Sequence, residues 1–282
     1  MSQVPLEWQG QSVGSMSRSF KEVLHGRLHA AAIHLGVSVA IATVLVLLIV
    51  NVWYPSPLFN LAKGRDIFFI VLGCDITLGP VMTLIIFNIR KPRRELVRDV
   101  AIIAMVQLAA MVYGVSTLLQ ARPAYIVYNV GQFNVPLANE MLVGMGDQEG
   151  DAKAQVPWFG PKLVGARLPE ELQEHNRLLF SSVSGAGDVF EMTSYFVAYD
   201  DVKQEVIAHA RSTEQIAKEL HLDVNAVQAA VGSYAKKGTP FGLLPLLVRK
   251  TVALAVVDRS SGALLGIEPL GASVDDAQRA AP

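Results

Sequence analysis

Long apolar runs occupy the N-terminal part of the chain, and each is long enough to cross a membrane once. They cover residues 30–50, 67–89 and 100–119, or 21, 23 and 20 residues. At a rise of about 1.5 Å per residue, each helix would match the hydrocarbon core of a bilayer, which is about 30 Å thick. Residues 122–282 mix apolar and polar positions, as a water-soluble domain does. The pattern therefore predicts three N-terminal transmembrane α-helices followed by a small soluble domain.

Basic residues near the helix ends predict the orientation, because Lys and Arg are retained on the cytoplasmic side of a membrane. Eight of them precede the first run or fill the loop between the second and third runs, and three lie in the opposite segments. The eight are Arg18, Lys21, Arg27, Arg90, Lys91, Arg93, Arg94 and Arg98, and the three are Lys63, Arg65 and Arg122. We therefore expect a bacterial inner-membrane protein with a cytoplasmic N-terminus and a periplasmic C-terminal domain.

The domain boundaries follow from these runs. We predict a cytoplasmic tail over residues 1–28, a three-helix transmembrane domain over 29–121 and a periplasmic domain over 122–282. Residues 1–15 are polar and without periodicity, so we expect them to be disordered. Met16 is an alternative start of the protein.

Composition excludes some functions and leaves others open. The chain is 51% hydrophobic and 17% charged, and its net charge of −1 provides no basic field that would attract nucleic acid. The single cysteine, Cys74, lies inside the second apolar run. It allows no intrachain disulfide and no cysteine-based metal site.

Asp75 is a carboxylate near the middle of the second run, where an ionised side chain costs several kcal/mol unless it is paired, hydrated or protonated. Counting residues along the runs places Thr43, Gln107 and Tyr113 within a turn or two of its depth, which predicts a polar network among three helices. One interpretation makes Asp75 a proton relay or a contact for a partner helix. The interpretation that we favour makes it a hydrogen-bond acceptor that locks the helices together. His34, near the cytoplasmic end, is interpreted as an interfacial histidine.

Small residues around Asp75 predict close helix packing. Asp75, Gly79 and Thr83 recur at intervals of four and share one helical face. Pro80 removes a backbone donor and bends the helix, while the glycines let another backbone approach. Gly114 gives the third run a small-residue surface of its own. The complete predicted packing motif comprises Asp75, Gly73, Gly79, Pro80, Gln107, Tyr113 and Gly114.

Motifs in and around the runs carry a family resemblance. The second run contains Gly73-x-Asp75-x-x-Leu78-Gly79-Pro80. The other pieces are Ile33-His34-Leu35-Gly36, Val52-Trp53-Tyr54-Pro55, Arg93-Arg94-Glu95-Leu96-x-x-Asp99, Gln107-Leu108-Ala109-Ala110-x-x-Tyr113-Gly114 and Ala121-Arg122-Pro123. Together they resemble type IV pilin accessory proteins of the TfpX/TfpZ type, densely over residues 17–130 and thinly beyond.

The resemblance implies a non-enzymatic, chaperone-like role in the assembly or stability of a cognate type IV pilin in the inner membrane. The implied partners are this major pilin, other pilus assembly proteins and membrane lipid, with no cofactor. A pilin has a hydrophobic N-terminal helix in the same membrane before assembly, and the resemblance implies that this helix could pack on the surfaces around Gly79 and Gly114.

The soluble domain is predicted to be α+β. Residues 125–135 form a hairpin pattern with its turn at Gly131, and residues 247–267 form a second one. Helical spacing covers residues 169–180 and 212–236.

The second helical segment has the spacing of a helix-turn-helix, which would suggest DNA binding. However, its second helix has no basic residue before Lys236, and the predicted location is periplasmic. We therefore interpret the segment as a helical hairpin capped at Ser212 and Asp223.

Aromatic residues outside the apolar runs receive two interpretations. Trp53, Tyr54, Tyr125 and Tyr128 follow the outer ends of spans and are predicted to form an interfacial belt. Trp158 and Phe159 lie in a Gly/Pro-rich loop. They are either anchors for a partner protein or a plug for the domain's core.

Catalytic and metal-binding patterns are missing from the sequence. The histidines lack the spacing of a zinc site, and there is neither a nucleophile elbow nor a phosphate-binding glycine loop. We therefore predict no catalytic residue and no metal ligand. Two alternatives to a pilin accessory factor stay open: a transport component or enzyme that uses a titratable Asp75, and a ligand-sensing membrane protein.

Overall fold

The structure, a computed structural model, describes residues 7–62, 64–87, 91–141, 156–169, 171, 173, 175, 176, 178, 180, 187–236 and 238–273. Side chains within helices or strands at 7–19, 66, 67, 70–72, 74, 75 and 271–273 are not among those described. The chain divides into two compact units. The helical unit comprises Met1–Leu47 and Asp66–Thr117, and the sheet unit comprises Leu48–Arg65 and Leu118–Pro282.

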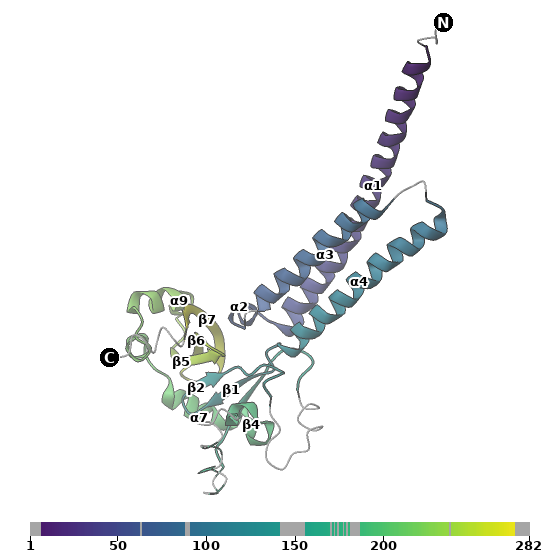
Figure 1. The fold of residues 1–282 in the computed structure, drawn as a ribbon. Coiled ribbons are helices and arrows are strands. Elements are labelled where there is room, and N and C mark those ends of the chain that lie inside the picture. Colours follow the sequence, from purple (N-terminus) through teal and green to yellow (C-terminus); the bar gives the residue numbers. More distant parts are fainter. Residues whose placement is uncertain are drawn as a thin grey trace. The chain divides into compact units, whose positions relative to one another are not determined.

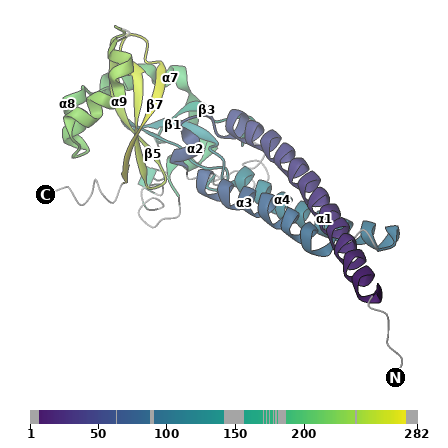
Figure 2. The same ribbon diagram turned by 90° about the horizontal axis from the view of Figure 1, so that it is seen from above.

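The helical unit is built from long helices that run side by side (Figure 1, Figure 2). They are α1 (Glu7–Leu48), α3 (Gly64–Ile86) and α4 (Arg93–Gln120). Helix α1 is unbroken because no proline lies between Pro5 and Pro55. It therefore includes most of the segment that was expected to be disordered, residues 1–15.

Among the described residues, two helical segments are long and apolar enough to cross a membrane, Phe20–Trp53 and Arg93–Gln120. The prediction of a third span falls on α3, whose described apolar part, Ile76–Ile86, is shorter. The side chain of Asp75 and several others earlier in α3 lie outside the described ones. Proline at position 80 lies inside α3 without ending the helix.

The sheet unit also contains short helices. A π-helix, η1 (Ile49–Trp53), continues α1, and α2 (Leu58–Leu61) follows it. Later in the chain, the 3₁₀ helices η2 (Val189–Glu191) and η3 (Thr193–Tyr195) precede a strand.

The described part of the sheet unit holds a seven-stranded mixed sheet in the order β4-β3-β1-β2-β5-β6-β7. The strands are β1 (Tyr125–Asn129), β2 (Gln132–Asn134), β3 (Lys162–Ala166), β4 (Phe196–Ala198), β5 (Phe241–Val248), β6 (Thr251–Asp258) and β7 (Leu264–Ser273). The predicted hairpin at Gly131 is confirmed as β1 and β2, and the second predicted hairpin corresponds to β6 and β7. The expected mixed α+β character of this part is therefore confirmed.

The sequence interpretation missed β5 (Phe241–Val248), which carries a proline at position 245. Strand β5 pairs along its whole length with β6. The backbone N–H of Leu243 points away from β6 and donates to Arg211. Position 245, two residues on, faces the same side, where β2 pairs only with Leu246 and Leu247. Proline is tolerated there because no ladder hydrogen bond is lost.

Three helices of the sheet unit cover its strands within the described residues: α7 (Tyr199–His209), α8 (Thr213–Glu219) and α9 (Val224–Lys236), as Figure 2 shows. The predicted helical hairpin over 212–236 is confirmed as α8 and α9. Ser212 caps α8 in a capping box, and the Asp223 carboxylate accepts from the backbone N–H of Asn225. Of the predicted helix over 169–180, the described positions from 173 onward are helical.

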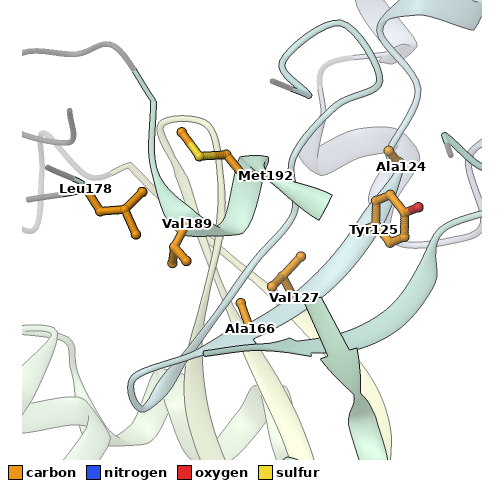
Figure 3. Close-up of a cluster of buried hydrophobic side chains, with 7 residues drawn as sticks. All are labelled: Ala124, Tyr125, Val127, Ala166, Leu178, Val189 and Met192. Carbon is orange, nitrogen blue, oxygen red and sulfur yellow. The ribbon is translucent and has the colours of Figure 1, made fainter. Parts of the chain in front are cut away.

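The hydrophobic core takes up one face of each helix of this hairpin. Helix α9 buries Val227 and Val231, and α8 buries Ile216, in one cluster with Leu243 and Leu254 of the sheet. The apolar faces of both helices are therefore used inside the domain. A second cluster gathers around β1, where Tyr125 and Val127 lie with Ala166 and Met192 (Figure 3).

Candidate functional site

His34 joins all three helices of the helical unit through polar contacts. Its Nδ1 atom lies 2.6 Å from the hydroxyl of Thr83 on α3, and its Nε2 atom lies 2.8 Å from the amide oxygen of Gln107 on α4. Thr83 is 3% exposed, so its hydroxyl has left water. A buried polar group of this kind stabilises the fold only when it is hydrogen-bonded. The polar network His34–Thr83–Gln107 meets that condition.

The direction of these hydrogen bonds follows from the amide of Gln107. A carbonyl oxygen can only accept, so Nε2 of His34 must donate to Gln107. In a neutral imidazole the Nδ1 atom then accepts, and the hydroxyl of Thr83 donates to it. The protons therefore run in one direction from α3 through α1 to α4. Hydrogen bonds arranged in such a chain polarise and strengthen one another.

Gly79 lies directly against this network. A Cβ atom at position 79 would come within 2.9 Å of Nε2 of His34 and 2.8 Å of the Gln107 side-chain carbon Cδ. Real Cβ atoms do not approach neighbours so closely, so a side chain at this position would have to displace the ends of the Gln107 and His34 side chains. The small residue that the sequence assigned to close packing is therefore used within this chain's own bundle.

The predicted motif residues divide into those near the network and those away from it. Asp75 lies one turn before Gly79 on the backbone of α3, and its side chain is not among those described. Gly73 has open space where a Cβ atom would be. Gly114 is buried, whereas the side chain of Tyr113 is 77% exposed on the outside of α4. Thr43, which was also expected to face inward, donates to the carbonyl of Val39 in its own helix.

The sequence interpretation placed Thr83 and Gln107 at or near the polar network but did not include His34 in it. Thr83 was placed on the face of Gly79, and Gln107 in the polar network, but His34 was interpreted as an interfacial residue. Counted along the predicted spans, His34, Thr83 and Gln107 lie within about two turns of the cytoplasmic ends. The depth count was centred on Asp75, which is why it selected Tyr113 in place of His34.

A groove of about 550 Å³ lies between α3 and α4 beside the network. Its walls are almost entirely apolar. The lining residues are Leu78, Gly79, Met82, Ile86, Lys91, Asp99, Ile102, Ile103, Val106, Gln107 and Ala110. Because Val106 is 66% exposed, the groove opens to the surface of the helical unit.

Charged side chains make contacts around the segment between α3 and α4. The ammonium group of Lys91 lies 2.6 Å from the carboxylate of Asp99 at the groove's end. The guanidinium of Arg27 donates to the carbonyl of Phe87, directly after α3. A cation at a helix C-terminus satisfies a carbonyl that the helix itself leaves open.

Tyr54, in the sheet unit, directly follows η1. It is fully buried, and its hydroxyl donates to the carbonyl of Leu118 in the last turn of α4, 2.8 Å away. Burial raises the pKa of the phenol above its ordinary value, so the proton that it donates is retained. The ring packs edge-on against Phe59.

The predicted aromatic belt is wrong for three of its four members. Tyr54, Tyr125 and Tyr128 are all buried. Tyr128 packs edge-on against Phe133, with ring centroids 5.5 Å apart. These aromatics follow the ends of the long helices in sequence, but the domain folds over them and uses them as core.

Arg122 fastens a loop to the end of α4. Its guanidinium donates to the carbonyl of Leu119 at 2.5 Å and to the carbonyl of Pro157 through Nε and Nη2, at 3.1 and 2.8 Å. The guanidinium carbon also lies 5.6 Å from the ring centroid of Trp158, a cation–π distance. Burial lowers the pKa of Arg122, which still leaves an arginine charged at neutral pH.

Trp158 and Phe159 themselves point outward, with 64% and 82% of their surface exposed. The interpretation of Trp158 as a plug for the core does not fit this exposure. Among the described residues, no group of three or more His, Cys, Asp or Glu side chains is arranged to hold a metal ion.

Comparison with known proteins places the chain. Residues 22–63 match the family of the fimbrial assembly protein FimB. A fimbrial assembly protein of serogroup I from Dichelobacter nodosus is 28% identical over 185 residues, or 66% of this chain and 72% of the relative. Another, of serogroups C1 and C2 from the same organism, is 31% identical over 113 residues, or 40% of this chain and 86% of the relative. The chain belongs to the FimB family of fimbrial assembly proteins. No solved structure matches it.

The family suggested by the sequence motifs is thereby confirmed as a fimbrial assembly family. The matched FimB segment, residues 22–63, contains both His34 and Tyr54. His34 of α1 bonds to Gln107 in the helical unit, and Tyr54, which follows η1, bonds to Leu118 in the sheet unit.

A double-mutant cycle on the network should detect its coupling. We expect His34→Leu and Gln107→Leu each to lower the free energy of unfolding, because each leaves a buried polar partner unsatisfied. The double variant should cost less than the sum of the two, by about 1 kcal/mol, a typical interhelical hydrogen bond in a membrane. Equilibrium unfolding in detergent measures the cycle. Strictly additive effects would show that the two side chains do not interact.

Proposed function

We propose that this chain is a non-enzymatic accessory factor that promotes the stability or assembly of a cognate type IV pilin in the bacterial inner membrane. Membership of the FimB family carries the proposal, since the relatives are named fimbrial assembly proteins. The polar cluster described above ties helices together, which is compatible with a structural role.

The membrane location has its own support. Large apolar side chains such as Ile33, Val44, Ile85 and Met105 are more than half exposed on the helical unit. Water-soluble proteins rarely expose continuous apolar surfaces of this kind, so lipid or another apolar helix covers them. In the proposal α3 is the third span. Basic residues on one side of the spans then place the N-terminus in the cytoplasm and residues 122–282 in the periplasm.

The groove between α3 and α4 is the proposed docking surface for the hydrophobic helix of the pilin. The sequence suggested the surfaces around Gly79 and Gly114, but Gly79 packs against His34 and Gln107 of the same chain. The adjoining groove is apolar and open, which suits an apolar helix in a bilayer. Helix association in lipid depends on such shape complementarity, because the hydrophobic effect does not distinguish a helix from lipid tails.

Asp75 is proposed to be a structural acceptor of the same bundle. It lies on α3 one turn from Gly79, which packs against the network. An acceptor at this position would add a hydrogen bond to the bundle without any proton transfer.

Filling the groove should weaken pilin binding without unfolding the protein. Val106→Trp places a bulky ring in the groove at an exposed position, and Val112→Trp places the same ring on α4 away from the groove lining. Val112 is 59% exposed, close to the 66% of Val106, so the two changes are matched. We expect Val106→Trp to reduce co-purification of co-expressed pilin about tenfold, or about 1.4 kcal/mol, and Val112→Trp to leave it unchanged.

The membrane abundance of both variants is measured in parallel by immunoblot. Equal recovery of pilin with both variants at normal abundance would show that the groove does not bind it. Loss with both alike would point to a broader face of α4.

A further inference from the structure

The loop over residues 156–161 is held at the ends of two candidate membrane spans. Arg122 bonds its carbonyl at Pro157 and the carbonyl of Leu119, in the last turn of α4. On its other side, Gly160 has positive φ, and a Cβ atom there would lie 3.5 Å from the carbonyl oxygen of Val52 in η1. Leu119 and Val52 each lie within two residues of the C-terminal limit of a candidate span. The residues beside the loop therefore lie at the C-terminal ends of candidate spans.

Between Pro157 and Gly160 the loop exposes Trp158 and Phe159. The rings expected to form an interfacial belt, those of Tyr54, Tyr125 and Tyr128, are buried in the domain. The exposed aromatic pair thus lies beside the helix ends, although it follows α4 by almost forty residues in the sequence.

We propose that Trp158 and Phe159 insert into the headgroup region of the outer leaflet and hold the domain against the membrane. The proposal rests on the membrane spans of the preceding section, but it needs no pilin. Tryptophan is favoured at a membrane–water boundary because it combines a large apolar ring with one N–H donor. Phe159, the more exposed of the two, supplies apolar area for the acyl boundary.

The attachment by Arg122 also suits a lipid boundary. One face of the Trp158 ring lies over the guanidinium, which restricts how the indole can turn. Lys162, exposed at the start of β3, follows the loop directly and can meet a lipid phosphate. An aromatic pair with a cation beside it is the composition of membrane-surface segments. A protein partner would need no such fixed position at the helix ends.

Tryptophan fluorescence of the full chain in lipid vesicles tests the proposal. The chain has three tryptophans, and replacing Trp8 and Trp53 with phenylalanine leaves Trp158 as the sole reporter. The vesicles contain phosphatidylethanolamine and phosphatidylglycerol, with or without lipid brominated at the 6,7 positions of one chain. We expect about twofold or stronger quenching by the brominated lipid and weak quenching by aqueous acrylamide.

The matched control carries Trp8, Trp53 and Trp158→Phe together with Gln228→Trp. Gln228 is exposed on α9, so the new indole should be quenched by acrylamide and not by brominated lipid. If Trp158 behaves like this control, the proposal is overturned. If Trp158 escapes acrylamide only after pilin is added, the loop binds protein instead of lipid, which also overturns it.

A second measurement avoids the tryptophan replacements. Phe159→Cys with Cys74→Ala carries a nitrobenzoxadiazole dye at an exposed position, where the dye does not disturb the core. The control carries the same dye at Gln228→Cys, an exposed position. In vesicles, a dye at position 159 that emits at shorter wavelength and about twice as brightly as the dye at position 228 supports insertion. Equal emission at the two positions contradicts it.

Discussion

Gly79→Leu is expected to destabilise the helical unit. A side chain at position 79 has to displace Gln107 and His34, whose atoms lie within 2.8 and 2.9 Å of its Cβ position. Overpacking of this kind costs about 1–3 kcal/mol, and the His34–Gln107 hydrogen bond, worth about 1 kcal/mol, is lost with it. We expect a total near 3 kcal/mol. The midpoint of thermal unfolding in detergent and the abundance in membranes both measure this loss.

Gly73→Leu on the same helix is the control. A Cβ atom at position 73 has nothing within 4 Å, so the same substitution meets open space. It should leave the unfolding midpoint close to that of the unchanged protein. Similar losses for the two variants would show that leucine disturbs α3 through its backbone or its lipid contacts and not through the network. In that case the close approach at Gly79 would be unimportant.

Arg122→Ala should have the next largest effect, this time in the sheet unit. The change removes hydrogen bonds from a buried guanidinium to the carbonyls of Leu119 and Pro157. Hydrogen bonds to charged groups contribute about 1.5–3 kcal/mol each, and the abandoned carbonyls lose their donor. We expect a loss of about 3 kcal/mol in the free energy of unfolding. Thermal unfolding followed by circular dichroism in the β-sheet region reports it.

Arg249→Ala provides the comparison for Arg122. The Arg249 side chain is 54% exposed and pairs with Glu140 at the surface. Exposed ion pairs contribute about 1 kcal/mol or less, so this variant should be nearly as stable as the unchanged protein. A small effect of Arg122→Ala, equal to that of Arg249→Ala, would mean that the loop is held in place by other contacts. Cleavage within residues 156–161 by a protease gives an independent measure, since the freed loop should be cut faster.

Two hydrogen bonds tie the N-terminal segment of the chain to α4, one in each unit. In the helical unit, His34 of α1 donates to Gln107. In the sheet unit, Tyr54, which follows η1, donates to the carbonyl of Leu118. Both residues lie in the segment that matches the FimB family.

Local patterns predicted much of the fold because they depend on neighbours in the sequence. Apolar runs predicted the long helices, alternation around Gly131 predicted the first hairpin, and Ser212 with Asp223 predicted the caps of α8 and α9. The strands β3, β4 and β5 were missed. Strand β3 pairs with β1 and β4 with β3, more than 25 residues away in each case, whereas β5 carries Pro245, a residue uncommon in strands.

The sequence by itself determined the long apolar helices, the hairpin at Gly131, the helical hairpin over 212–236 and the family that the chain resembles. Only the tertiary structure decided which polar groups meet, because the rotation of each helix about its axis selects the partners. That is why His34 contacts Gln107, 73 residues away, while Tyr113 faces outward. It also decided which aromatic residues are exposed, since burial depends on the way the domain folds over the helix ends. Tyr54 is buried in the core, whereas Trp158 is exposed.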